Sequence, residues 1–127
     1  MNRIMLLGLI LLTLYGCKTM EQMYVEDGYR ELKGEELKAK VSGSTVNAGR
    51  WQDTYAADGK MSGTSFGGSG DYSGTWQIDS NGKLCIECAN QYVNGCAKVF
   101  IKDSSGSIEW IEADGKAYSV KIAPAKK

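Results

Sequence analysis

Three two-residue turn signals limit most closely how this chain can fold. Asp58-Gly59, Asn81-Gly82 and Asp114-Gly115 suit tight β-hairpins, because both residues of such a pair tolerate positive φ. Ser104-Ser105-Gly106 is a looser signal of the same kind. The intervals between these turns are too short for crossover helices, so neighbouring strands are expected to pair antiparallel.

The segments between the turns have the alternation expected of strands. Apolar side chains fall at every second position, so that Ile108 and Trp110, for example, share one face. The clearest predicted strands are Tyr72–Ile78, Lys83–Cys88, Ala97–Lys102, Ser107–Glu112 and Lys116–Ile122. We predict a mainly β fold, an antiparallel meander of about six to eight strands that forms a small barrel or a curled sheet.

One short N-terminal helix is expected before the strands. In the segment Leu32–Val41, Leu37 and Val41 lie at helical spacing, and Glu36 and Lys40 form an i,i+4 pair. The helix is expected to end at Ser42-Gly43, because glycine commonly follows the last helical residue.

The N-terminus has the pattern of an export signal. A short positive segment ending at Arg3 precedes an apolar run, Ile4–Leu14. That run is too short to span a bilayer, which needs about 20 apolar residues, but it suits the hydrophobic region of a signal peptide. We therefore predict that residues 1–16 are a signal peptide.

The signal ends at Leu14-Tyr15-Gly16-Cys17, which resembles the bacterial lipobox. The resemblance implies a diacylglyceryl group on Cys17, cleavage before it and acylation of the new N-terminus. Each buried CH₂ contributes about 0.8 kcal/mol, so several chains make a lasting anchor. Lys18 stands where aspartate favours the inner membrane in Gram-negative bacteria, which favours the outer membrane, with the domain facing the periplasm or the cell surface. The alternatives are an ordinary secretory signal and an uncleaved N-terminal helix.

These features divide the chain into a signal peptide, a lipidated cysteine with a polar tether (17–31), a β-rich domain (32–123) and a C-terminal tail (124–127). The chain contains no histidine, which removes the commonest general base and the commonest transition-metal ligand. Fifteen basic residues balance fifteen acidic ones and form no basic stripe, so nucleic-acid binding is not expected.

Export makes Cys85, Cys88 and Cys96 disulfide candidates. Strand parity places Cys85 and Cys96 on one face and Cys88 on the apolar face. This predicts a Cys85–Cys96 bridge and a buried thiol at Cys88. A one-residue slip of register, or a bulge in 89–95, would pair Cys88 with Cys96 instead, and an exposed Cys88 would serve dimerisation.

A redox or metal role for Cys85 and Cys88 is less consistent with the pattern. An extended strand holds residues i and i+3 too far apart to bond. Haem attachment needs a histidine where Ala89 stands, and zinc lacks a fourth ligand at any familiar spacing. We therefore expect no metal and no cofactor.

The order of several motifs along Leu32–Ile101 resembles a family of small secreted bacterial β-proteins of unknown function. The matching segments are Gly34–Leu37, Ser42–Val46, Asp58–Gly63, Gly74–Trp76, Leu84-Cys85 and Cys96–Val99. The resemblance implies a Cys85–Cys96 pair, and it carries no established activity. Cys88 stands where this family has an aromatic residue. A looser likeness to avidin- and lipocalin-type barrels lies in turn chemistry, such as Ser73–Trp76.

No arrangement of residues points to catalysis. The glycine-rich Phe66–Asp71 lacks the Lys-Ser/Thr ending of a phosphate loop and is not followed by a helix. A serine nucleophile without histidine needs a lysine base, and no S-x-x-K is followed by a supporting motif. We therefore expect no catalytic residues and no enzyme activity. The pair Glu109 and Glu112 is interpreted as a solvated face.

Two functions remain. The first is a lipid-anchored, non-catalytic binding or interaction module of the cell envelope, whose partners are the membrane and an envelope protein or glycan. The alternative is a small-molecule carrier with a cavity in the barrel. Small barrels usually fill their interior with their own side chains, which favours the first; an apolar pocket would favour the carrier.

Overall fold

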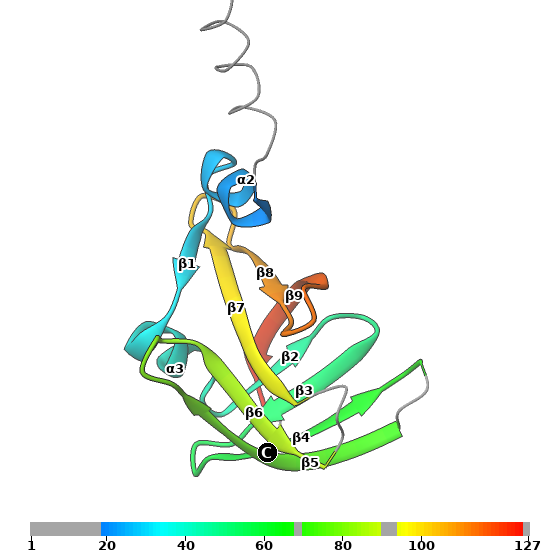
Figure 1. The fold of residues 1–127 in the computed structure, drawn as a ribbon. Helices are drawn as coiled ribbons and strands as arrows, with labels where there is room; N and C mark the ends of the chain where they lie inside the picture. The colour runs from blue at the N-terminus through cyan, green and yellow to red at the C-terminus, as the bar shows by residue number, and fades with distance from the viewer. Residues whose placement is uncertain (1–18, 68–69, 90–93, 126–127) are drawn as a thin grey trace, which may run out of the picture.

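The computed structural model describes residues 19–67, 70–89 and 94–125, in which nine strands and two helices are found (Figure 1). In chain order the elements are α2 (Met20–Glu26), β1 (Arg30–Leu32), α3 (Gly34–Val41), β2 (Ser44–Asn47), β3 (Trp51–Tyr55), β4 (Lys60–Ser65), β5 (Gly70–Ile78), β6 (Leu84–Cys88), β7 (Gly95–Lys102), β8 (Ser107–Ile111) and β9 (Ala117–Pro124).

The turn signals lie between strands as predicted. Gly59, Gly82 and Gly115 have φ of 91°, 81° and 87°, the left-handed region in which glycine is favoured. Each consecutive pair from β2 to β9 is antiparallel. The predicted meander is therefore confirmed.

The meander closes into an eight-stranded barrel. β2 pairs with β9 and β8 pairs back on β7, so the sheet has no break from β2 to β9. β1 is an additional strand. It lies beside the second half of β7, where Leu32 opposes Val99, while β6 occupies the same edge at the first half, where Cys85 opposes Cys96. This confirms the mainly β fold with a small barrel.

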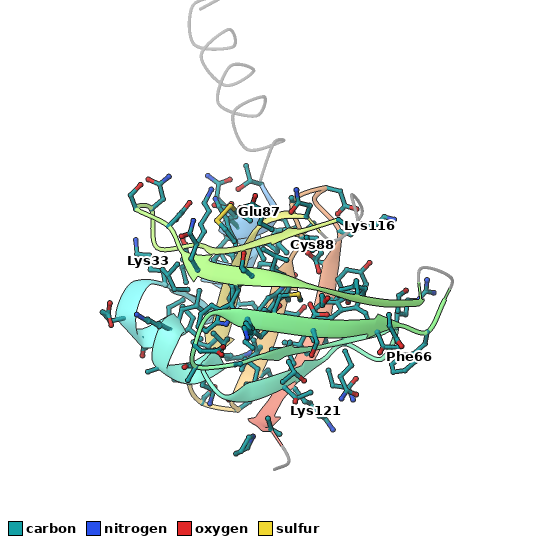
Figure 2. All side chains as sticks on the ribbon, turned by 90° about the horizontal axis from the view of Figure 1, so that it is seen from below. Lys33, Phe66, Glu87, Cys88, Lys116 and Lys121 are labelled. Atoms are coloured by element: carbon teal, nitrogen blue, oxygen red, sulfur yellow. A yellow bond between two sulfur atoms is a disulfide. The ribbon has the colours of Figure 1, made fainter. Side chains whose placement is uncertain are left out.

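The interior of the barrel is filled by the chain's own side chains, as Figure 2 shows in a view from below. Tyr55 stacks on Trp110 with ring centroids 6.2 Å apart, and Trp51 meets Trp110 edge-on at 6.0 Å. The largest fully buried side chains are Trp110, Tyr55, Leu37, Leu84, Val41, Val46 and Val99. The barrel therefore encloses a packed core, as is usual at this strand number.

The two ends of the barrel differ. α3 lies at one end and buries Leu37 and Val41 completely, which confirms the predicted short helix. At the opposite end β2, β4, β6 and β8 finish, and β3, β5, β7 and β9 begin, because successive strands alternate in direction. We call this second end the loop end.

The segment expected as a polar tether carries structure from Thr19 onward. α2 packs on the outer face of β7, where the rings of Tyr24 and Phe100 lie 5.3 Å apart. Strand alternation places Phe100 on the outer face of the barrel. It is nevertheless only 2 % exposed, because α2 covers it. The expected tether (17–31) thus includes a helix and most of a strand. No described helix is long and apolar enough to cross a membrane.

Candidate functional site

The cysteines are arranged as strand parity predicts. Cys85 and Cys96 oppose each other directly across β6 and β7, with Cα atoms 4.0 Å apart, and are joined by a disulfide. The alternative Cys88–Cys96 pairing is therefore excluded. Cys88 is a half-buried thiol that packs against the core.

One cluster of described residues has the spacing of a metal site without its chemistry. A carboxylate oxygen of Asp79 and the sulfurs of Cys85 and Cys96 lie within 4.8 Å of one another. The two sulfurs are bonded to each other in the disulfide, whereas metal binding to cysteine requires a free thiolate. This cluster therefore cannot hold a metal while the bridge is intact.

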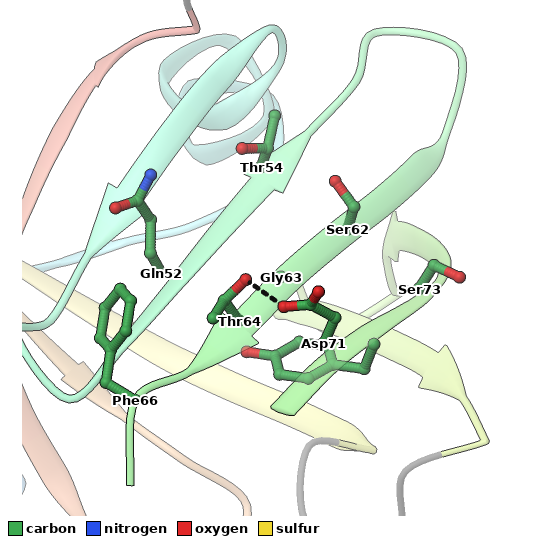
Figure 3. A pocket seen from close by; sticks show the side chains of 9 residues that line it. Gln52, Thr54, Ser62, Gly63, Thr64, Phe66, Asp71 and Ser73 are labelled. Atoms are coloured by element: carbon green, nitrogen blue, oxygen red, sulfur yellow. Dashed lines mark hydrogen bonds between the residues drawn. The ribbon is translucent and has the colours of Figure 1, made fainter. Parts of the chain in front are cut away.

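Two rows of small polar side chains cross the outer face of β3, β4 and β5 (Figure 3). Neighbouring strands lie about 4.8 Å apart, so each row is a regular series of hydrogen-bonding groups. By row, the residues are Gln52, Thr64 and Asp71, then Thr54, Ser62 and Ser73. The hydroxyls of Thr45 and Thr54, 3.0 Å apart, extend the second row to β2.

These rows line a shallow hollow of about 630 Å³, which we call the polar hollow. Thr64 donates a hydrogen bond of 2.8 Å to Asp71 and holds that carboxylate in place. Phe66, at one edge, is 62 % exposed, which is unusual for a large apolar side chain and leaves its ring accessible. Among the described residues, no lysine or arginine lines the hollow.

Behind the polar hollow, inside the barrel, Asp53 is almost fully buried. Its Oδ2 accepts a 3.0 Å hydrogen bond from the Tyr55 hydroxyl, and its Oδ1 accepts one from the Tyr72 hydroxyl. Asp53, Gly63 and Tyr72 lie opposite one another on three adjacent strands. A Cβ at Gly63 would overlap both Asp53 and Tyr72, so the glycine lets Tyr72 reach across β4.

Glu112, just after β8, is a second acidic group at the loop end. Burial, followed by the charges of Asp53 and Asp114, raises the pKa of Glu112 to about 7. Burial also raises the pKa of Asp53, against the opposing effect of its two tyrosine hydrogen bonds. The pKa of Tyr72 is raised by burial and then by donation to Asp53. Asp53, Tyr55, Tyr72 and Glu112 form what we call the carboxyl cluster.

Two indole donors in the same interior lack an acceptor. The Nε1 atoms of Trp51 and Trp110 are buried and have no hydrogen-bond partner among the described residues. Each tryptophan precedes an acidic residue of the cluster by two positions, so Trp51 and Asp53, like Trp110 and Glu112, point to the same side of the sheet. Buried donors of this kind are uncommon and call for an explanation.

Neither the polar hollow nor the carboxyl cluster was predicted from the sequence. The interpretation of Glu112 as part of a solvated face is wrong, because Glu112 is half-buried at the loop end. The alternation Trp51, Asp53, Tyr55 does place Asp53 on an apolar face, and Ile108, Trp110, Glu112 does the same for Glu112. This alternation would have indicated that both acids face the interior. The sequence gives a weaker indication of the polar hollow, because alternating Thr and Ser are common on any solvated strand face.

The lipobox cysteine, Cys17, lies outside the described residues. Comparison with protein-family models, with curated proteins and with solved structures found no match.

Proposed function

We propose that this protein is an exported, lipid-anchored binding module of the cell envelope, and that it binds a neutral glycan in the polar hollow. The anchor is supported by the lipobox at Leu14–Cys17 and by the preceding signal pattern. Binding is supported by one observation above all, the regular double row of polar side chains beside the exposed ring of Phe66.

The chemistry of the polar hollow fits sugar hydroxyls. A sugar hydroxyl both donates and accepts hydrogen bonds, as do the serine and threonine hydroxyls and the amide of Gln52. Asp71 offers a strong acceptor whose position is already fixed by Thr64, so little ordering cost remains on binding. The ring of Phe66 can stack on the apolar face of a pyranose.

Other ligand classes fit less well. Phosphorylated or otherwise anionic polymers need basic partners, and the described residues that line the hollow include one carboxylate and no lysine or arginine. The centre of a protein interface is usually depleted of charged residues and enriched in aromatic side chains and arginine. Of the two aromatic residues that line this hollow, Phe66 lies at its edge and Tyr72 directs its hydroxyl inward to Asp53. A neutral glycan is the best match.

Binding can be tested on a glycan array followed by calorimetry with the neutral oligosaccharide that gives the strongest signal. The protein carries Cys17→Ser, so that it is soluble without detergent. Phe66→Ala should weaken binding at least about tenfold, since an aromatic contact at a hot spot contributes about 2 kcal/mol. Asp71→Asn should weaken it less, because the amide keeps one acceptor.

Lys121→Ala, on β9, is the matched control and should leave affinity unchanged. The proposal fails if no neutral glycan binds, or if Phe66→Ala and Lys121→Ala bind equally well. Capture of an anionic polymer or a protein in place of a glycan would also contradict it.

The anchor is tested separately in growing cells. Cys17→Ser should abolish incorporation of a clickable palmitate analogue and release the protein from the membrane fraction. Persistent labelling of this variant would contradict the lipobox interpretation.

A carrier function is the second candidate, and the loop end favours it. The unpaired indole donors of Trp51 and Trp110 and the acceptors of Glu112 would suit a small polar ligand at this end of the barrel. Native mass spectrometry of protein purified from envelopes would detect such a ligand as an added mass. A ligand lost in Trp51→Phe but kept in Phe66→Ala would favour the carrier.

A further inference from the structure

The lipid anchor, if it is formed at Cys17, lies extremely close to folded structure. α2 is fixed from its first residue by a capping box, in which the Thr19 hydroxyl accepts from the Gln22 amide at 3.2 Å and the Gln22 side chain accepts from the Thr19 amide at 3.0 Å. Thr19 is two positions after Cys17 in the sequence, with Lys18 between them. Fully extended, the segment from Cys17 to Thr19 spans at most about 7 Å.

α2 is held on the barrel by contacts on one side. The ring of Tyr24 packs on Phe100, and its hydroxyl donates to Glu109 at 3.5 Å. Glu21 pairs with Lys98. Exposed ion pairs contribute little, but the burial of Phe100 and the pairing of β1 with β7 directly after α2 keep this segment in place. A lipid on Cys17 would therefore hold the barrel itself and not a loose tether.

α2 exposes three large apolar side chains beside the polar Gln22 and Glu26. Met20, Met23 and Val25 are 40 %, 52 % and 61 % exposed. They are three of the four large hydrophobic side chains that are exposed among the described residues, and the fourth is Phe66. Met20 and Met23 are neighbours at i and i+3 on the helix surface. A concentration of this kind marks a surface that contacts something apolar.

We propose that α2 docks on the membrane surface and places Met20 and Met23 among the lipid headgroups, so that the barrel has one fixed orientation. This inference rests on the proposed lipid anchor. Lipid is the occupant that the chain itself indicates, because the acylated residue lies within about 7 Å of the start of the helix. α2 carries Glu21 and Glu26 and no basic residue, so the proposed contact rests on its apolar side chains and is not assisted by anionic lipid.

Docking through α2 would turn the polar hollow away from the membrane. α2 contacts β7 near its C-terminal end, where Phe100 and Lys102 lie, and that end is the one opposite the loop end. Figure 1 shows α2 at the far side of the molecule from the hairpin of β4 and β5. A ligand in the outer space of the envelope would thus reach the hollow without passing the lipid surface.

Methionine oxidation tests the docking without a label. Lipidated mature protein is reconstituted in vesicles of phosphatidylethanolamine and phosphatidylglycerol, exposed to hydroxyl radicals and analysed by mass spectrometry. Met20 and Met23 should be oxidised several-fold more slowly than in the soluble Cys17→Ser protein, because lipid excludes the oxidant. Phe66 should be modified equally in both forms.

The outcomes separate the docking from the anchor. Protein that carries no acyl mass and does not float with vesicles would refute the anchor, and the docking with it. Lipidated protein that floats but is oxidised at Met23 as fast as Cys17→Ser would refute the docking alone. Protection of Met23 in concentrated Cys17→Ser protein without vesicles would assign this face to a second copy of the chain and overturn the proposal.

A paired substitution gives a second measurement. Met20→Ser with Met23→Ser should leave acylation and flotation unchanged, since neither residue lies in the lipobox. In the unsubstituted lipidated protein the amides of α2 should exchange with deuterium more slowly on vesicles than in Cys17→Ser. The paired variant should lose that slowing, and its retention would contradict insertion of the methionines.

Discussion

The raised pKa of Glu112 makes a specific prediction about stability. Its ordinary pKa of 4.5 rises to about 7 in the folded protein. The folded state therefore holds the proton more tightly than the unfolded state, and Glu112 contributes stability that is present below pH 4.5 and lost as pH rises through 7. Asp53 adds to this loss with the same sign, because its pKa is raised too.

Glu112→Gln should remove most of that loss. Glutamine resembles the protonated carboxyl in shape and cannot ionise. The shift from 4.5 to about 7 corresponds to about 3 kcal/mol, at about 1.4 kcal/mol per pKa unit. At pH 8 the variant should therefore be more stable than the unsubstituted protein by up to about 3 kcal/mol, and at pH 4.5 the two should be nearly equal.

Urea unfolding of the Cys17→Ser protein between pH 4.5 and pH 8.5 measures this difference. With an m-value of about 1.5 kcal/mol/M, the unfolding midpoint of Glu112→Gln at pH 8 should be higher by up to about 2 M. Glu87→Gln is the matched control, because Glu87 is exposed on the outer face of β6 and undergoes the same change of charge. Parallel pH profiles for Glu112→Gln and the unsubstituted protein would refute the reasoning.

Three further substitutions test the interior and the bridge. Gly63→Ala should destabilise by about 1–3 kcal/mol in urea, because its Cβ would overlap Asp53 and Tyr72, whereas Gly67→Ala, with open space around it, should be neutral. Tyr72→Phe should cost about 1–3 kcal/mol by removing a donor to Asp53, and Tyr118→Phe is its control for the loss of a hydroxyl from a partly buried tyrosine. Replacing Cys85 and Cys96 together by Ser should lower the free energy of unfolding by about 3 kcal/mol, as expected for a loop of this length; equal stability with and without reductant would contradict it.

The barrel could be predicted because its determinants are local. The pairs Asp58-Gly59, Asn81-Gly82 and Asp114-Gly115 fix hairpins through backbone preference alone. Once the hairpins are set, parity along each strand decides which side chains face inward. The Cys85–Cys96 bridge follows from the same parity, since the two residues are directly opposed.

The packing of α2 and β1 could not be predicted in the same way. β1 is three residues long and pairs with β7, about seventy positions away, so no local period marks it. Phe100 breaks the alternation of β7, and only its cover, Tyr24, explains why an apolar residue stands on the outer face. A contact between distant segments of this kind leaves no periodic signal in either of them.

The carboxyl cluster was missed for a different reason. An acid between apolar neighbours is normally counted against burial, because an unpaired buried charge is costly. Two tyrosine donors offset part of that cost for Asp53, and one of them reaches it only because Gly63 has no side chain. The sequence shows each residue, but it does not show that Asp53, Gly63 and Tyr72 lie in one row across β3, β4 and β5.

The two acids of the cluster therefore differ in whether the fold accounts for their burial. Asp53 has two donors and helps to hold three strands in register. The carboxyl of Glu112 accepts no hydrogen bond from the described residues, and the charge of Asp53 opposes its ionisation, so the folded barrel becomes less stable when this carboxyl ionises. Packing alone would be served better by glutamine at this position. If a ligand binds at the loop end, the carboxyl of Glu112 is the group that it would stabilise most. A hydrogen-bond donor on the ligand would offset both the cost of burying the charged carboxylate and its repulsion from Asp53.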